Sequence, residues 1–301
     1  GSTSLPPRLR EAMQRRHDGV DEVSREAQAM LENVADRLGA ALRDYIEGRA
    51  GSSNASEIKA AVQATELDDV LRILRDAGVD EARVSWFEGL DRIAQDAAAA
   101  VGDGGLPASD RSLNLPAVDA ALHAMYTTDL PGAWDTRVVR PTAEAVLQGL
   151  HNMVLAESLE DATRRLVAAG QGSIRTAYVE VVTQTAEFDR FVSWEVAEAA
   201  DPDHEALWVY LGPDDGITRP FCDALVGKAF EYADLAPLNN QQTPAHPIWS
   251  CGGYRCRHSW VQLVPDIAAK MGIPRGSAAD IKAANAAAIV ARFGKGGKKA
   301  A

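Results

Sequence analysis

The chain has 301 residues, of which 46% are hydrophobic and 25% charged, and its formal net charge is −12. These values are typical of a globular protein, and the length suffices for a sizeable core in one or two domains. The acidic balance disfavours a dedicated nucleic-acid binder, because neutralising phosphates requires clustered Lys and Arg. No run of 18 apolar residues occurs, so we expect no membrane span.

The first half of the chain is predicted to be mostly helical. Apolar residues recur at spacings of three and four over residues 20–46, the pattern of an amphipathic helix. Two more helices are expected over 56–78 and 81–100. The second of these is predicted to turn four apolar residues inward: Val84, Phe87, Leu90 and Ile93. Abundant alanine and only 6% aromatic residues favour helices that pack through small side chains.

Two segments interrupt the helical pattern. Residues 102–116 are rich in Gly, Ser, Asp and Pro, and residues 127–136 lack any period, so both are predicted to be irregular. The remaining helices of this region are predicted over 116–126, 143–155, 159–169 and 174–199.

The pattern changes after Pro202. Residues 206–216 alternate and contain β-prone side chains, which predicts a strand followed by a turn. A short helix is expected over 218–227, with Thr218 as its N-cap and Gly227 as its C-cap. Further strands are predicted over 228–235 and 254–265, an irregular segment over 236–253, and an alanine-rich helix from residue 277.

The predicted fold class is α+β, with a mostly α-helical N-terminal region followed by a small mixed α/β C-terminal domain that holds a Cys/His cluster. The expected divisions are a helical region (1–140), helices leading into the C-terminal unit (141–200), the small α+β domain (201–276), and an Ala-rich helix with a basic tail (277–301). An α+β domain of this size buries little core, so a metal or a covalent link would help to stabilise it.

All three cysteines, Cys222, Cys251 and Cys256, lie in one window that also contains His246 and His258. Three thiolates and one imidazole complete a tetrahedral zinc site, so Zn²⁺ is the expected cofactor of a metal site here. Cys256 and His258 are two residues apart and would point to the same face of a strand. The spacing is not that of a standard zinc finger.

Three alternatives for these thiols stay open. Buried cysteines can act as small apolar side chains. A disulfide could join Cys222 to Cys251 or to Cys256. A nucleophilic pair could form between Cys222 and either His246 or His258. The odd number of cysteines and a start without signal-peptide features favour synthesis in a reducing cytoplasm.

Asp214 and Asp215 form a second candidate site. Two adjacent carboxylates can bind a cation or transfer protons. However, the sequence Pro-Asp-Asp-Gly is typical of a turn. We therefore favour a structural turn, in which Arg219 could pair with one of the aspartates.

The order of motifs over residues 170–265 resembles that of the phage Mu F-like minor head proteins, also called phage head morphogenesis proteins. The shared features are a strand with Trp, an Asp turn, a Thr-Arg pair, a Cys on a short helix closed by Leu-x-Gly, a Pro-x-His and an Arg-Cys. They correspond to Trp208, Asp214 or Asp215, Thr218, Arg219, Cys222, Leu225, Gly227, Pro244, His246, Arg255 and Cys256.

The chain departs from this family pattern in two places. The usual tight Cys-Arg-Cys is replaced by Cys251 and Cys256 with an insertion between them. A second cysteine soon after Cys222 is missing, because Leu225 occupies that neighbourhood. Both departures concern the expected metal ligands more than the order of the motifs.

The resemblance implies a structural protein of the virion that lies inside the head and is made in the host cytoplasm. Its expected partners are the portal protein and capsid or scaffold proteins, and contact with packaged DNA is left open. It would act in head morphogenesis or DNA delivery and would not be an enzyme. The alternative is a metal-dependent nuclease or a Cys/His hydrolase built on the C-terminal cluster.

Overall fold

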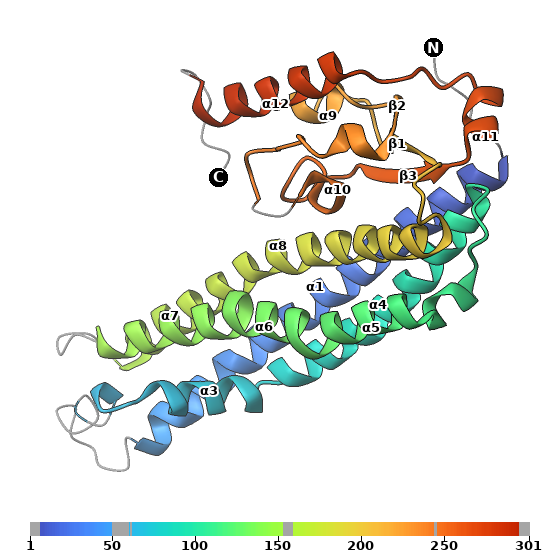
Figure 1. Ribbon diagram of the computed structural model, residues 1–301. Coiled ribbons are helices and arrows are strands. Elements are labelled where there is room, and N and C mark those ends of the chain that lie inside the picture. Colours follow the sequence, from blue (N-terminus) through green and yellow to red (C-terminus); the bar gives the residue numbers. More distant parts are fainter. Residues whose placement is uncertain (1–6, 50–59, 61, 153–158, 244–245, 295–301) are drawn as a thin grey trace. The chain divides into compact units, whose positions relative to one another are not determined.

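The computed structural model describes residues 7–49, 60, 62–152, 159–243 and 246–294. It confirms the predicted α+β class, because most of the described chain is helical and a small antiparallel sheet lies in the C-terminal part (Figure 1). The chain forms two compact units. Unit 1, the sheet unit, comprises the described parts of 1–22, 90–124 and 183–301, and unit 2, the helical unit, those of 23–89 and 125–182. Because this division cuts through long helices, the predicted boundaries at 140, 200 and 276 stay predictions.

The helical elements up to residue 200 are α1 (Pro7–Arg49), α3 (Leu67–Asp76), α4 (Val79–Asp103), η1 (Asp110–Asn114), α5 (Pro116–Ala124), η2 (Met125–Asp129), α6 (Leu130–Trp134), η3 (Asp135–Val139), α7 (Arg140–His151) and α8 (Leu159–Ala200). The elements that follow are β1 (Leu207–Leu211), α9 (Pro220–Asp223), β2 (Ala229–Phe230), η4 (Tyr232–Leu235), α10 (Pro247–Ser250), β3 (Ser259–Leu263), α11 (Pro265–Lys270) and α12 (Ala278–Phe293).

The helical unit packs through aliphatic and alanine side chains, as the composition predicts. The apolar stripe of α1 is buried within it, through Val23, Ala27, Leu31, Val34, Leu38, Leu42 and Ile46. On α4, Ala82 and Trp86 are buried, and Trp86 stacks on Trp134 of α6 with ring centroids 5.5 Å apart. Val84 was predicted to point inward, and this was wrong, because its side chain is 54% exposed. In this part of α4 the buried face is formed by Ala82 and Trp86.

Residues 127–136 are helical, so the prediction of an irregular segment was wrong. Two π-helical turns, η2 and η3, flank α6, and the run continues into α7. Pro131 lies in the first turn of α6, where a missing N–H is tolerated. Leu130 and Trp134 are buried, so packing outweighs the turn-like local composition.

Helix α8 is continuous, although a break was predicted between residues 169 and 174. Gly170 lies inside it, where an added Cβ would come within 2.9 Å of Leu38 and 3.2 Å of Val146. This glycine therefore permits the close approach of α8 to α1 and α7 within the helical unit, and it does not mark a helix end.

The helix predicted over 56–78 is interrupted before α3 begins. Thr65 and Glu66 are not helical, and Glu66 forms a capping box with Asp69 at the start of α3. The Thr65 hydroxyl lies 3.0 Å from the Tyr45 hydroxyl, which fixes the break against α1. The predicted start near residue 56, like residues 153–158 after α7, lies outside the described residues.

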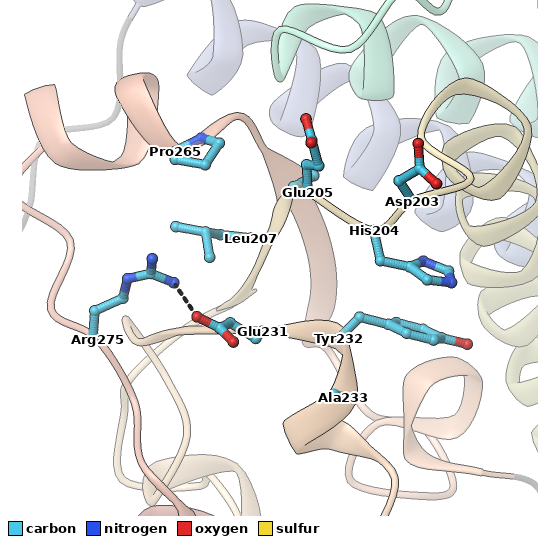
Figure 2. Close-up of a pocket in the computed structure, with 10 residues that line it drawn as sticks. Asp203, His204, Glu205, Leu207, Glu231, Tyr232, Ala233, Pro265 and Arg275 are labelled. Carbon is cyan, nitrogen blue, oxygen red and sulfur yellow. Dashed lines mark ion pairs between the residues drawn. The ribbon is translucent and has the colours of Figure 1, made fainter.

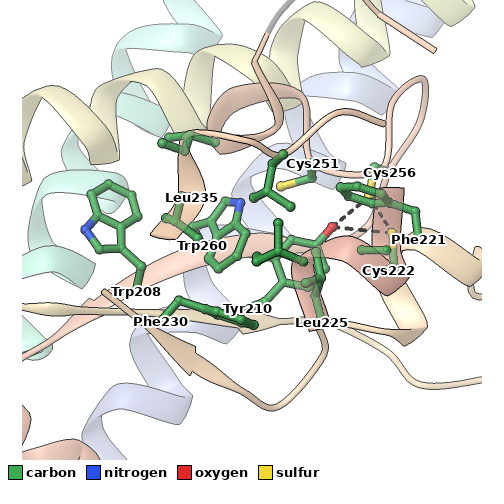
Figure 3. Close-up of a cluster of buried hydrophobic side chains, with 14 of the residues drawn as sticks. Trp208, Tyr210, Phe221, Cys222, Leu225, Phe230, Leu235, Cys251, Cys256 and Trp260 are labelled. Atoms are coloured by element: carbon green, nitrogen blue, oxygen red, sulfur yellow. Dashed lines mark hydrogen bonds between the residues drawn. The ribbon is translucent and has the colours of Figure 1, made fainter. Parts of the chain in front are cut away.

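The sheet has the order β2-β1-β3 and is antiparallel throughout. Its side chains alternate between two buried faces. One face carries Trp208, Tyr210, Phe230 and Trp260, which pack with residues of α9 and α12 (Figure 3). The opposite face carries Leu207, Val209, Val261 and Leu263, which pack with α11 and with Met13 of α1. The predicted strands therefore exist, but they are shorter than the sequence pattern indicated.

Four local predictions near the cysteines were wrong in detail. The C-cap of α9 is Ala224, not Gly227. Arg219, not Thr218, is the N-cap of α9, because the Thr218 hydroxyl instead donates to the carbonyl of Pro213 at 2.8 Å. Residues 254–258 precede β3 and are not part of it. The segment 236–253 was expected to be irregular but contains the short helix α10.

The predicted alanine-rich helix is confirmed as α12. Ser277 caps it in a capping box with Asp280, and Ile281, Ala284 and Ala288 are buried. Within the part of the chain that the structure describes, no helix combines the length and apolar character needed to cross a bilayer. The motif residue Pro244 and the basic residues 295–301 lie outside the described residues.

Candidate metal centre

Cys222, Cys256 and His258, called here the Cys/His cluster, come together in the interior of the sheet unit. The two Sγ atoms are 3.7 Å apart, and Cys256 Sγ lies 3.6 Å from His258 Nδ1. The three ligand atoms lie within 4.8 Å of one another, and all three residues are buried. This group could bind a metal ion through two thiolates and an imidazole.

The cluster forms where α9 meets the segment between α10 and β3. Cys222 lies on α9, whose first turn contains Pro220. Cys256 and His258 lie just before β3, and the His258 ring stacks on Tyr210 of β1 with centroids 5.3 Å apart and planes 4° from parallel. The pairing of β1 with β3 therefore brings together residues that are far apart in the sequence.

Tyr210 supplies a hydrogen-bond donor to the sulfurs. Its hydroxyl donates to Cys222 Sγ at 3.3 Å and lies 3.9 Å from Cys256 Sγ (Figure 3). Burial, followed by the nearby thiols, raises the pKa of Tyr210 well above its usual value. The hydroxyl therefore keeps its proton and can donate a hydrogen bond that orients a sulfur of the cluster.

Two glycines allow the backbone to approach the cluster closely. The Gly252 N–H donates to Cys256 Sγ at 3.2 Å, and a Cβ at Gly252 would lie 2.4 Å from Cys222 Sγ. A Cβ at Gly212 would lie 2.4 Å from Cδ2 of His258. A side chain at either position would displace a member of the cluster.

The protons are unequally shared between the two sulfurs. The hydrogen bond from Cys222, with a smaller contribution from Cys251, lowers the pKa of Cys256 well below its usual value. The same bond with Cys256, and then burial, raises the pKa of Cys222. Of the two thiols, Cys256 is therefore the one that loses its proton more readily.

Cys251 lies next to the cluster but not within it. It is fully buried, and burial, followed by a hydrogen bond with Cys256, raises the pKa of its thiol. Its backbone φ is 47°, a region that favours glycine. All three cysteines are free thiols, so the structure contains neither of the disulfides that the sequence left open.

His246 has a different role from the one predicted for it. Its Nδ1 accepts the N–H of Ile248 at 3.2 Å and thereby caps α10, while Nε2 lies 3.3 Å from the carbonyl oxygen of Ala236. In the described part of the chain, the group of possible metal ligands contains His258 and not His246. The nucleophilic pair of Cys222 with His246 therefore has no support in the geometry.

Arg190 of α8, like Tyr210 and Gly252, was not predicted from the sequence to belong to the site. It is only 4% exposed, and it donates to the carbonyls of Trp249 at 3.1 Å, Cys256 at 2.6 Å and His258 at 3.1 Å. Nothing in the local sequence indicates this role, because an arginine inside an amphipathic helix is normally a surface residue. The contact is visible only once the chain has folded.

The Pro-Asp-Asp-Gly segment is a turn, as favoured from its composition. Both oxygens of Asp215 accept hydrogen bonds from Arg257, at 2.8 and 2.9 Å, and these bonds lower the pKa of Asp215 to about 2. The predicted partner Arg219 instead donates to the carbonyl of Tyr254. Asp214 is exposed, and neither aspartate belongs to the Cys/His cluster.

The other motif residues serve the fold around the cluster. Trp208 and Leu225 are buried in the core that also contains the three cysteines. Gly227 has a φ of 76°, and its N–H donates to the carbonyl of Tyr210 at 2.8 Å. Arg255 is exposed, and its N–H donates to the hydroxyl of Thr183 on α8 at 3.4 Å.

A surface pocket of about 500 Å³ lies elsewhere in the sheet unit (Figure 2). The His204 ring stacks there on Tyr232 with centroids 4.1 Å apart, and Arg275 lies 4.0 Å from the carboxylate of Glu231. None of the residues predicted from the sequence lines it. Asp203, Glu205 and Glu231 outnumber the single arginine of the pocket. The only group of possible metal ligands among the described residues is the Cys/His cluster, which is therefore the better candidate site.

Comparisons with known proteins found no match for this chain: no protein-family model, no curated protein and no solved structure. The function proposed below accordingly starts from the geometry of the cluster and from the order of the sequence motifs.

Proposed function

We propose that this chain is a structural protein of a phage or phage-like particle, a minor head protein of the Mu F-like type, and that its Cys/His cluster is a structural zinc site. The burial of the cluster carries the zinc-site part of this proposal, and the order of motifs carries the rest. Cys222, Cys251, Cys256 and His258 are each at most 6% exposed. Structural zinc sites are closed by protein ligands, whereas catalytic ones keep a position open for water or substrate.

The distances within the cluster suit zinc. Zn–S bonds of about 2.3 Å and Zn–N bonds of about 2.0 Å place the ligands of a tetrahedral site roughly 3.5–3.8 Å apart. The observed separations are 3.7 Å between the two Sγ atoms and 3.6 Å between Cys256 Sγ and His258 Nδ1. Thiolate and imidazole ligands favour zinc over magnesium or calcium. We propose Cys251 as the fourth ligand, because it is buried and its thiol interacts with Cys256.

The alternative function, a metal-dependent nuclease or a Cys/His hydrolase, has less support. A nucleophile must be reached by its substrate, and Cys222 is 1% exposed. An activated thiol has a lowered pKa, whereas that of Cys222 is raised by its hydrogen bond to Cys256. The carboxylates of the nearby turn serve the fold, since Asp215 is held by Arg257.

The head-protein proposal adds the order of motifs to this geometry. The matched residues that the structure describes all fall within the sheet unit, around one core that contains Trp208, Cys222, Leu225 and Cys256. We propose that this unit docks inside the head and that the amphipathic helices of the chain contact the portal protein and capsid or scaffold proteins.

Two experiments test the proposal. Elemental analysis of the purified chain should find about one zinc per chain, with thiols that resist alkylation until a chelator is added. The chain should also co-purify with portal rings when both are expressed together, and its gene should lie beside genes for a portal protein and a terminase. Three freely reactive thiols without metal would contradict the zinc site. A chain that never associates with portal, and whose gene has no phage neighbours, would contradict the head-protein role.

A further inference from the structure

Arg190 is a buried cation whose hydrogen bonds go to backbone carbonyls and not to a carboxylate. The adjacent Asp189 forms its ion pair with Arg16 of α1, at 2.5 Å. A buried guanidinium is costly unless opposite charge lies nearby. The acidic groups close to Arg190 are the thiols of Cys251 and Cys256, the carboxylate of Asp189 and the hydroxyl of Tyr210, which keeps its proton. Because Arg16 already balances Asp189, the thiolates of the metal site are the remaining source of opposite charge.

The three carbonyls that Arg190 binds all lie in residues 249–258, the segment that carries three of the proposed metal ligands. Two belong to ligands of the proposed site, Cys256 and His258, and the third belongs to Trp249, two residues before Cys251. The Trp249 ring also packs edge-on against Trp194 of α8, with centroids 5.5 Å apart. One side chain of α8 thus fixes the backbone on both sides of the insertion that separates Cys251 from Cys256.

We infer that Arg190 is a positioning residue of the metal site, which fixes the backbone of two ligands through its guanidinium fork and balances the charge of a three-thiolate zinc centre. This inference rests on the proposed zinc site. Zn²⁺ with three thiolates and a neutral imidazole has a net charge of −1, which one buried arginine neutralises. With only two thiolates the centre would be neutral, and the buried charge of Arg190 would have no counterpart. The inference therefore also assigns Cys251 to the metal.

The test compares substitutions at Arg190 with the same substitutions at Arg16. The two arginines are matched, because they are 4% and 5% exposed and both make hydrogen bonds to or from α8. Arg190→Lys keeps the charge but cannot reach three carbonyls at once, and Arg190→Met also removes the charge. Zinc affinity is measured by competition with a chelator, and the number of bound thiolates from the thiolate-to-metal absorption of the Co²⁺-substituted protein.

We expect Arg190→Lys to lower zinc affinity by about 10- to 100-fold, the usual effect of losing a group that orients metal ligands, and Arg190→Met to lower it further. Arg16→Lys should lower the melting temperature and leave the zinc affinity of the folded protein unchanged. The wild-type Co²⁺ spectrum should correspond to three thiolates per ion, with Cys251 protected from alkylation.

The outcomes separate this inference from the zinc proposal. A wild-type chain that binds no zinc overturns the site itself and the role of Arg190 with it. Zinc binding that is equal in wild type and Arg190→Lys overturns the inference alone. If Arg190→Lys fails to fold at saturating zinc while Arg16→Lys folds, Arg190 supports the fold in general and the inference is wrong. A two-thiolate spectrum with a reactive Cys251 overturns the charge-balance argument without any variant.

Discussion

The helical unit and the sheet unit are stabilised in different ways. The stripe of α1 and the facing helices of the helical unit bury mostly aliphatic and alanine side chains, so buried apolar area is the main contribution to their packing. The core on one face of the small sheet instead combines five buried aromatic residues with three cysteines, and the buried side chains of His258 and Arg190 lie beside it. The contrast indicates that a three-stranded sheet with short strands depends more on specific polar links than the helical unit does.

The most severe test of this contrast is the substitution Cys256→Ser. We expect zinc binding to be lost and the free energy of unfolding of the sheet unit to fall by more than about 3 kcal/mol, because a structural metal contributes directly to folding. Far-ultraviolet circular dichroism should retain most of the helical signal, while the near-ultraviolet signal of Trp208 and Trp260 should be lost. Addition of a chelator should have the same effect on wild type and none on the variant. A single unchanged transition in both spectral regions would contradict the contrast.

Gly252→Ala tests the packing of the cluster without removing a ligand. The new Cβ would lie 2.4 Å from Cys222 Sγ and 3.1 Å from Cys256 Sγ, so one sulfur must shift. Overpacking of this kind costs about 1–3 kcal/mol, and zinc affinity should fall with it. Gly216→Ala is the control, because an added Cβ there meets nothing within 4 Å. Equal denaturation midpoints and zinc affinities for the two variants would show that the close approach at Gly252 is unimportant.

In the helical unit, Gly170 and Gly172 of α8 allow the same comparison between a crowded glycine and an uncrowded one. Gly170→Ala places a Cβ 2.9 Å from Leu38 and should destabilise the unit by about 1 kcal/mol, as mild overpacking does. Gly172→Ala has open space around it and should stabilise α8 by up to about 1 kcal/mol, because alanine is the better helix former. Thermal denaturation of both variants measures the difference. If both changes stabilise the protein, Gly170 is not a site of close helix packing.

The sequence sufficed for features that depend on local periodicity. The stripe of α1 follows from residues three and four apart, and the alanine-rich composition from Ser277 onward predicted α12, because helical periodicity and propensity are local. It failed for Gly170, where composition suggests a helix end but the reason for glycine is the approach of Leu38 from another helix.

The residues of the candidate site also differ in whether local sequence could reveal them. The thiols and His258 were found because residue type alone suggests metal binding. Their grouping was only partly predictable, since His246 caps α10 instead of joining the cluster. Arg190 could not be found at all, because it lies 68 residues from one of the carbonyls that it binds. Long-range partners of this kind depend on the register of β1 with β3 and on the packing of α8, which no local pattern encodes.

The smallest expected effect concerns the ion pair between Lys228 and Asp280 at the start of α12, 2.7 Å long. The hydrogen bonds from Lys228 and then Ser277 lower the pKa of Asp280 to about 2 in the folded chain, whereas an unfolded Asp titrates near 4. This carboxylate therefore stabilises the sheet unit above about pH 4, and its contribution is lost as the pH falls toward 2.

Because the pair is partly exposed, we expect Asp280→Asn to cost no more than about 1 kcal/mol at neutral pH. The difference in denaturation midpoint between wild type and Asp280→Asn should shrink as the pH falls from 4 to 2. Comparing the two at each pH cancels the loss of zinc by protonation of its ligands, because both proteins have the same cluster. A difference that stays constant over this range would show that the ionised carboxylate of Asp280 makes no net contribution to the stability of the sheet unit.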